Sequence, residues 1–289
     1  MKTILTAITL LVSISSFSQQ DLTFPVSTSL SEWKAFERKP PKSAVDKFIK
    51  GTPGEFQVYK QKDTEVPSPN LDSLRHALHF LDLNGDGKED VIFEGESGGE
   101  ATEVMIFVSA GQSYKKVFSS FEGIVKMDWE NNRLARLYID DWGCCDDYLV
   151  KHMIYQVTYS QANIPNFKKV YQGLSIKDGM IPDTLLEKPF RFEVLNDGYK
   201  IRSAPTIDDS SAQSWDNDQT MKGNGNSIGR LIKGATGTAL AKRRDNTGRE
   251  WLFVQIDEPY LPRNDIIYVD NKFPTKLMGW ISSRFIKTQ

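Results

Sequence analysis

The sequence predicts a mainly β fold, in which an N-terminal antiparallel β domain with a short helical preface precedes a second β unit. Between residues 74 and 176, short segments rich in β-branched and aromatic residues alternate with turn residues. No regular alternation of helix and strand interrupts them, which excludes a doubly wound α/β fold. The apolar fraction of 39% and the charged fraction of 26% are typical of a soluble globular protein.

Residues 1–18 have the layout of a secretory signal peptide. Lys2 provides a positive start, residues 4–14 form an apolar core, and small residues precede Gln19. This core is too short to span a bilayer, and the remaining sequence contains no transmembrane candidate. We therefore expect an exported protein, periplasmic or extracellular, without membrane insertion. The net charge of −2 gives no indication of a nucleic-acid surface.

The helical preface is expected at about residues 21–51. Residues 31–36 and 43–51 each begin with a serine that can cap a helix, and the second segment ends in glycine. Residues 55–60 alternate apolar and polar side chains, which predicts a strand. By the same reasoning we expect further strands at residues 77–81, 91–93, 102–109, 114–121, 124–129, 134–139 and 148–159.

The loop at residues 82–90 separates the first two strands of this series and carries oxygen-bearing side chains at alternate positions. Gly85 and Gly87 tolerate positive φ, so the chain can bend and point these oxygens inward. Hard oxygen donors of this kind are the ligands that Ca²⁺ takes. The candidate calcium ligands are the side chains of Asp82, Asn84, Asp86 and Asp90 and the backbone carbonyl of Lys88.

The setting of this loop between two strands, with a final carboxylate at Asp90, resembles the calcium loops of FG-GAP and VCBS repeats. An EF-hand would need a glutamate at the twelfth loop position, between two helices, and that position is Phe93. The resemblance covers residues 74–108, which is one repeat, whereas a β-propeller needs at least four blades. It implies one calcium-binding loop. The alternative is a solvated turn that joins two strands.

Residues 95–99 match the G-x-S-x-G pattern of a nucleophile elbow. Such an elbow must lead into a helix, but residues 102–108 alternate as a strand. His152 is the only histidine downstream that could act as a base. We therefore expect a glycine-rich hairpin loop at this position.

Cys144 and Cys145 are the only cysteines, and two aspartates precede and follow the short segment that contains them. Adjacent Cα atoms lie about 3.8 Å apart, less than the roughly 4.4–6.8 Å that a disulfide prefers. A strained vicinal bridge and a pair of thiols in a turn both stay open. The four carboxylates could form a second cation site or an acid/base pair, although a solvated loop is commoner. The candidate ligand site therefore comprises Asp140, Asp141, Cys144, Cys145, Asp146 and Asp147.

Four motifs follow a linker at residues 177–189. They are an Arg-Ser-x-Pro strand, an Ile-Gly-x-Leu turn, a Trp-containing strand and a closing Gly-Trp-Ile-Ser-Ser segment. This order is similar to bacterial SH3-like (SH3b) domains, over about residues 190–289. The resemblance implies a small barrel that binds a cell-wall component, a peptide or a protein.

Two insertions, at residues 208–224 and 258–276, depart from that pattern. Trp215 and Tyr260 lie in these insertions and are candidates for a ligand groove. Trp251 and Trp280 are further aromatic candidates, but for both we favour a place in the core of the barrel.

Together these features predict an exported, non-catalytic binding protein with a structural calcium site. The alternative is a secreted hydrolase that acts on wall or glycan material through the acidic loop around Cys144. Two carboxylates that face each other about 5–10 Å apart would favour the hydrolase. Carboxylates that turn away into solvent would favour binding.

Overall fold

The computed structural model describes residues 33–34, 37–52, 54–60, 70–97, 101–111, 113–121, 123–142, 149–211, 225–257 and 273–289. The expected signal peptide at residues 1–18 lies outside this part of the chain. So do several residues of the candidate ligand sites, namely Cys144, Cys145, Asp146, Asp147, Trp215 and Tyr260.

The mainly β class with a short helical preface is confirmed. The preface contains α1 (Lys42–Gly51), the 3₁₀ turn η2 (Gln57–Lys60) and α2 (Leu71–His76). The next eight strands are β1 (Leu78–Leu81), β2 (Asp90–Glu96), β3 (Thr102–Ala110), β4 (Ser113–Phe121), β5 (Gly123–Glu130), β6 (Arg133–Asp141), β7 (Leu149–Tyr159) and β8 (Pro165–Ile176). The C-terminal part contains β9 (Phe190–Val194), β10 (Tyr199–Arg202), β11 (Ser227–Leu231), β12 (Thr236–Arg244), β13 (Glu250–Ile256), β14 (Lys276–Ser282), η4 (Ser283–Phe285) and β15 (Ile286–Thr288).

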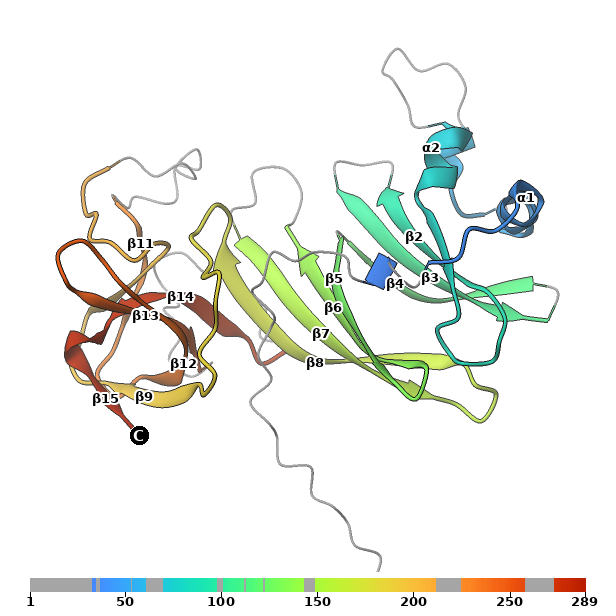
Figure 1. Ribbon diagram of the computed structural model, residues 1–289. Coiled ribbons are helices and arrows are strands. Elements are labelled where there is room, and N and C mark those ends of the chain that lie inside the picture. Colours follow the sequence, from blue (N-terminus) through green and yellow to red (C-terminus); the bar gives the residue numbers. More distant parts are fainter. Residues whose placement is uncertain are drawn as a thin grey trace, which may run out of the picture.

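The N-terminal half has three layers, with the antiparallel sheet β1-β2-β3-β4 in the middle. Figure 1 shows α1 and α2 on one side of this sheet and strands β5–β8 on the other. The outer cluster lies under the helices and comprises Phe48, Ile49, Phe56, Tyr59, Leu74, Leu78, Phe80, Val91, Phe93, Met105 and Phe107. The inner cluster lies between the two sheets and comprises Trp33, Leu81, Leu83, Ile92, Val104, Ile106, Phe118, Ile124, Met127, Leu134, Leu137, Ile139, Met153 and Val157.

The middle position of this sheet accounts for its continuous apolar runs. Successive side chains of a strand point to opposite faces. In β3, Met105 and Phe107 join the outer cluster, whereas Val104 and Ile106 join the inner cluster. A strand that is buried on both faces therefore needs apolar residues at every position rather than at alternate ones.

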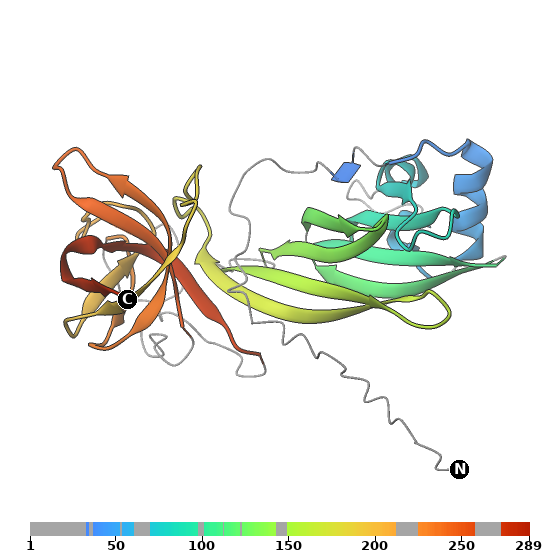
Figure 2. The same cartoon turned by 60° about the horizontal axis from the view of Figure 1, so that its bottom comes forward.

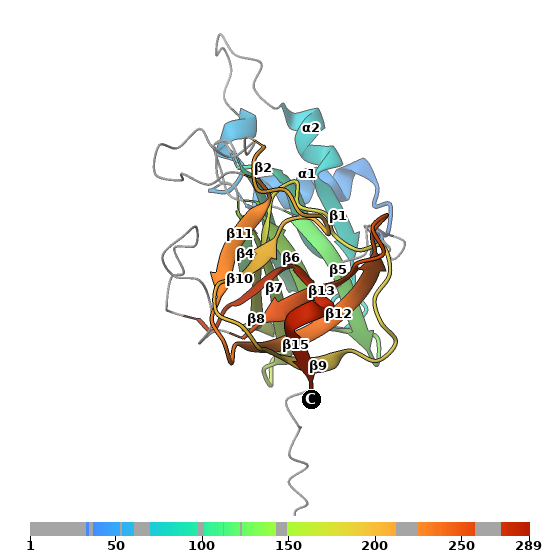
Figure 3. The ribbon, with the colours of Figure 1, turned by 90° about the vertical axis from the view of Figure 1, so that its left-hand side faces the viewer.

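A second sheet continues from the N-terminal half into the C-terminal half. Its order is β15-β9-β12-β13-β14-β8-β7-β6-β5, and β10 pairs with both β14 and β11. The join is a parallel contact in which Lys276 and Leu277 of β14 lie opposite Gly173 and Leu174 of β8. Figure 2 shows the curled C-terminal strands beside the N-terminal layers, and Figure 3 shows them from the C-terminal side, in front of those layers.

The C-terminal core includes side chains from both halves. Phe192, Ile201 and Val254 pack with Leu174 and Ile176 of β8. Residues of the N-terminal half therefore complete the core of the C-terminal unit, and the two halves are not independent in packing.

Trp251 and Trp280 are buried, but the place expected for them in the core of the barrel is wrong. They lie on the other face of β13 and β14 from Leu252, Val254 and Leu277, which belong to the C-terminal core. Each tryptophan is 1% exposed, and the two form one cluster with Phe253 and Met278. Ile181 packs against this cluster from the connection between β8 and β9. That connection contains neither helix nor strand, in agreement with the linker expected there.

Two local expectations for the preface were wrong. The strand expected at residues 55–60 is not formed: Gln57–Lys60 is the turn η2, and Phe56 before it has a φ of 61°. Phe56 and Tyr59, three residues apart, both enter the outer cluster. That spacing fits a helical turn and not the two-residue period of a strand. Ser43 does not cap α1, since the helix already begins at Lys42 behind Pro41, and the N-terminus has no side-chain cap.

Candidate functional site

The oxygen-rich loop at residues 82–89 joins β1 to β2, between strands as expected. Gly85 and Gly87 have φ values of 70° and 81°, which confirms that both adopt the left-handed conformation. The side chains of the loop fold back onto its own backbone. Asp82 Oδ1 accepts hydrogen bonds from the amides of Gly85 (2.8 Å) and Asp86 (3.2 Å), and Asp82 Oδ2 accepts one from Gly87 (2.8 Å).

Asp86 and Lys88 form a second set of contacts in the loop. Asp86 Oδ1 accepts a hydrogen bond from the Lys88 amide at 2.9 Å. Its Oδ2 atom lies 3.3 Å from Lys88 Nζ in an exposed ion pair. The predicted ligand Asp86 therefore faces the loop backbone while its charge is partly compensated by lysine.

Asp90 is a fully buried carboxylate at the end of the loop. Its Oδ2 accepts a hydrogen bond from the Leu83 amide at 3.0 Å, and its Oδ1 accepts one from the Ser109 amide of β3 at 2.9 Å. Burial raises the pKa of Asp90 to about 6, the two amides oppose this shift, and the charges of Asp86 and Asp82 add to it. Asp90 thus connects the loop to β3, although the burial of its negative charge is unfavourable.

The loop also lies against two turns of the long sheet. The Leu83 carbonyl accepts a hydrogen bond from the Leu134 amide and lies 2.9 Å from the Tyr159 hydroxyl. Asn84 and Asn163 each donate from the side-chain amide to the carbonyl of the other at 3.2 Å. The loop therefore bridges the middle sheet and the ends of strands β5–β8.

The donor chemistry of the loop fits calcium, but the described side chains do not form a completed site. No three His, Cys, Asp or Glu side chains gather to hold a metal ion in the part of the chain that the structure describes. Each carboxylate oxygen can accept more than one bond, so its amide contact leaves capacity for a cation. Calcium binding by Asp82, Asn84, Asp86, Lys88 and Asp90 stays a prediction.

In calcium-free buffer, we expect the free energy of unfolding to fall as pH rises from about 4 to about 6. The pKa of Asp90 is about 6 in the folded protein against a reference value of 3.8, so between these values the unfolded chain loses the proton first. A shift of about two units corresponds to about 3 kcal/mol. Denaturant titrations at both pH values should show this fall in the wild type and a smaller one in Asp90→Asn. Equal pH dependence of stability in both proteins would contradict the raised pKa of Asp90 in the folded state.

The two described members of the acidic cluster, Asp140 and Asp141, do not face each other. Adjacent strand residues point to opposite faces of a sheet. Asp141 Oδ2 lies 3.3 Å from Lys151 Nζ, whereas Asp140 Oδ1 lies 2.6 Å from His152 Nδ1. Asp140 and Asp141 therefore do not supply the facing pair of carboxylates that would favour a glycoside hydrolase.

Ser175 is a site residue that the sequence did not indicate. Its hydroxyl lies 2.8 Å from His152 Nε2, so one imidazole joins a carboxylate to a serine. The three residues belong to three different strands and to no local motif. By contrast, Ser97 of the G-x-S-x-G segment donates to the Ala101 carbonyl at 2.6 Å, which agrees with the expected hairpin loop.

Comparisons of the chain with protein-family models, curated proteins and solved structures found no match. Within the described ranges, no helix combines the length and apolar character needed to cross a membrane.

Proposed function

We propose that this chain is an exported binding protein whose N-terminal layers are stabilised by calcium at residues 82–90. The observation that carries this proposal is the position of the oxygen-rich loop, which contacts β3 through Asp90 and the turns of the long sheet through Leu83 and Asn84. A cation in the loop would stabilise these contacts between the sheets.

Electrostatics favour a divalent cation in this loop. Asp82, Asp86 and Asp90 place three carboxylates within nine residues, and the burial of Asp90 makes its negative charge costly. Lys88 pairs with Asp86 at the surface, while Asp90 has no exposed surface through which water could solvate it. Calcium would supply two positive charges and accept oxygen ligands in a flexible geometry.

The binding role is assigned to the C-terminal unit, for which we propose an SH3-like fold and a cell-wall, peptide or protein ligand. Leu195, Ile232 and Phe285 are 39%, 56% and 47% exposed. The Leu195 amide donates to the Phe285 carbonyl at 2.9 Å, and the Gly234 amide donates to the Val194 carbonyl at 2.8 Å, so their three segments lie side by side. Exposed apolar side chains that gather in this way are typical of interaction surfaces.

Calcium titration with Asp86→Ala tests the metal site. We expect one equivalent of calcium to bind with measurable heat, and about 10 mM calcium to raise the free energy of unfolding by about 1 to 3 kcal/mol. This range follows from the roughly 10⁻⁴ to 10⁻³ M dissociation constants of extracellular calcium modules. Asp86→Ala should lose both effects, because it removes a ligand. Calorimetry and thermal melting of the mature protein provide the two readouts.

Glu89→Ala is the matched control, since it removes the same charge from the neighbouring part of the loop without removing a proposed ligand. It should keep the calcium response. Loss of the response in both variants would indicate unspecific attraction of calcium to an acidic loop. Absence of binding heat in the wild type would mean that the loop is a turn that binds no calcium. Pull-down with peptidoglycan and glycans, with and without calcium, then tests the proposed binding role.

A further inference from the structure

Asp140, His152 and Ser175 form a continuous hydrogen-bonded series across β6, β7 and β8. Asp140 Oδ1 lies 2.6 Å from His152 Nδ1, and His152 Nε2 lies 2.8 Å from Ser175 Oγ. Asp140 of β6 lies directly opposite His152 of β7. Ser175 of β8 lies opposite Val150, which precedes His152 by two residues in β7. Asp140 and Ser175 are each the second-last residue of their strand, so the series lies near the end of the sheet.

The order of these groups is that of an activated nucleophile. An ionised Asp140 can only accept hydrogen bonds, so His152 Nδ1 must donate to it. The neutral imidazole then presents a lone pair on Nε2, which accepts the hydrogen bond of the Ser175 hydroxyl. A serine, a base and a carboxylate that orients the base are the parts needed for nucleophilic catalysis on any fold.

The surroundings of Ser175 limit what could react there. Ser175 is 4% exposed and His152 is 6% exposed, whereas the Asp140 side chain is 18% exposed. A bulky acyl group could not reach a hydroxyl with so little exposed surface. The site therefore fits a short acyl group, such as acetyl, carried by an ester whose alcohol part stays outside.

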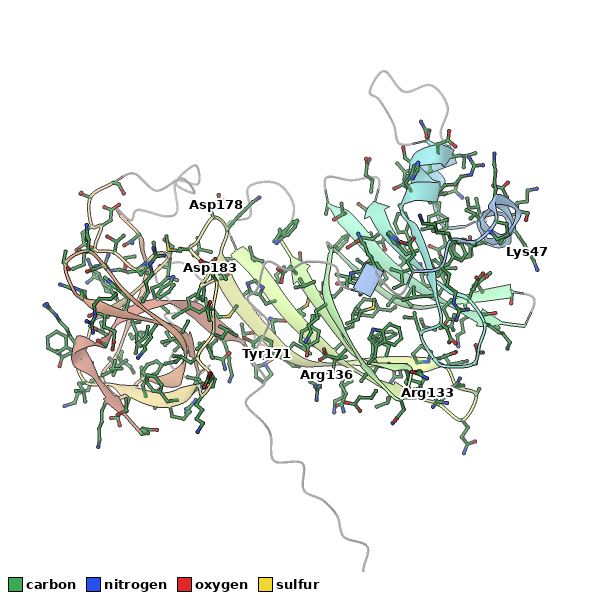
Figure 4. All side chains as sticks on the ribbon, viewed as in Figure 1. Lys47, Arg133, Arg136, Tyr171, Asp178 and Asp183 are labelled. Atoms are coloured by element: carbon green, nitrogen blue, oxygen red, sulfur yellow. The ribbon has the colours of Figure 1, made fainter. Side chains whose placement is uncertain are left out.

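Tyr171 and Gln255 bring further polar groups to the same face of the sheet. Tyr171, Gly173 and Ser175 alternate along β8 and thus share that face. A Cβ atom on Gly173, the residue opposite His152, would lie 2.7 Å from the Tyr171 hydroxyl, so the absent side chain makes room for that group. Figure 4 places Tyr171 on the side of the long sheet that is turned away from the middle sheet.

Gln255 is a fully buried amide that is only half satisfied. Its Oε1 accepts a hydrogen bond from the Tyr171 hydroxyl at 3.1 Å. Its Nε2 has no hydrogen-bond partner among the residues that the structure describes. A buried donor without a partner is costly in a folded protein.

We propose that Ser175 is the nucleophile of an acyl-ester hydrolase site that accepts acetyl esters, with His152 as general base and Asp140 as its positioning residue. This activity goes beyond the proposed calcium-stabilised binding role. Ser175 Oγ attacks the ester carbonyl carbon while His152 Nε2 takes the hydroxyl proton. The tetrahedral intermediate collapses, the carbon–oxygen ester bond breaks, and His152 returns the proton to the leaving alcohol. Water then attacks the acetyl carbon while His152 takes a proton from it, the bond between that carbon and Ser175 Oγ breaks, acetate leaves, and His152 returns the proton to Ser175 Oγ.

The test uses the mature, full-length protein with p-nitrophenyl acetate as the probe. We expect hydrolysis above the buffer rate and, in acid-quenched samples, one acetyl group on the peptide that contains Ser175. Ser175→Ala and His152→Gln should lower the rate by about 100-fold or more, the usual contribution of a nucleophile–base pair. Asp140→Asn should lower kcat by a similar factor and leave KM nearly unchanged, because Asp140 acts through His152.

Ser282→Ala is the matched control. Ser282 is a buried strand serine, 6% exposed, and lies in β14, away from the three-residue series. It should keep the wild-type rate. Peptide mapping of the acetylated wild type needs no variant, so it decides the question even if Ser175→Ala does not fold. Absence of acetyl-Ser175 in folded wild type, or an equal loss of rate in Ser282→Ala, would overturn the proposal.

Discussion

Replacing Trp280 with alanine is expected to lower the free energy of unfolding by about 4 kcal/mol, as typical for a buried aromatic side chain. Trp280 is 1% exposed and packs against Phe253 with ring centroids 5.3 Å apart. Its indole Nε1 donates to the Met180 carbonyl at 2.6 Å, which attaches the connection between β8 and β9 to the cluster formed by Trp251, Phe253, Met278 and Trp280. The variant therefore loses apolar contacts, leaves a cavity and removes the indole donor of the Met180 carbonyl.

Denaturant titration of the full-length protein measures this loss. Trp280→Phe should cost less, about 1 to 2 kcal/mol, since it keeps an aromatic ring and loses chiefly the hydrogen bond. Trp142→Ala is the control, because Trp142 is 47% exposed and should change stability by no more than about 0.5 kcal/mol. If Trp280→Ala were as mild as Trp142→Ala, the packing between β13, β14 and the connection from β8 to β9 would not depend on this residue. Faster proteolysis within residues 177–189 of Trp280→Ala would show that the connection has detached.

Features that depend on neighbouring residues could be predicted from the sequence. The strand at residues 102–109 was clear because β-branched and aromatic residues fill it, and the structure places β3 at Thr102–Ala110. The bend of the loop was equally local, since Gly85 and Gly87 were the residues that could adopt positive φ, and both do.

Features that depend on distant residues could not be predicted. The reciprocal contact of Asn84 with Asn163 joins residues that are 79 positions apart. The parallel pairing of Gly173 with Lys276 depends on how two units with separate hydrophobic patterns come together. Alternation in a single strand shows which side chains share a face, but not which strand will lie beside it.

The contrast between Ser97 and Ser175 shows the same limit at the level of a site. Ser97 lies in a recognisable motif, and its hydroxyl bonds to a nearby backbone carbonyl in a hairpin loop. Ser175 lies in no motif, yet strand register brings it to His152, 23 positions away. Catalytic arrangements are defined by geometry, which only the paired strands supply.

Replacing Phe48 with alanine is expected to lower the free energy of unfolding by about 4 kcal/mol, because a large cavity would open between α1 and the middle sheet. The Phe48 side chain is fully buried. The centroid of its ring lies 6.2 Å or less from the ring centroids of four other aromatic residues, Phe56, Phe80, Phe107 and Tyr114. Denaturant titration is the measurement. Leu71→Ala in α2 is the control, since Leu71 is 43% exposed and should cost far less.

The same variant separates the two faces of the middle sheet. Phe48 belongs to the outer cluster, whereas Leu83 of the oxygen-rich loop belongs to the inner cluster. Phe48→Ala should therefore reduce stability with and without calcium by the same amount, and its calcium affinity, measured by calorimetry where the variant is folded, should match the wild type. An affinity lowered together with stability would mean that the helical preface positions the loop through the sheet. In that case α1 would help to position the proposed calcium loop and would not only cover the outer cluster.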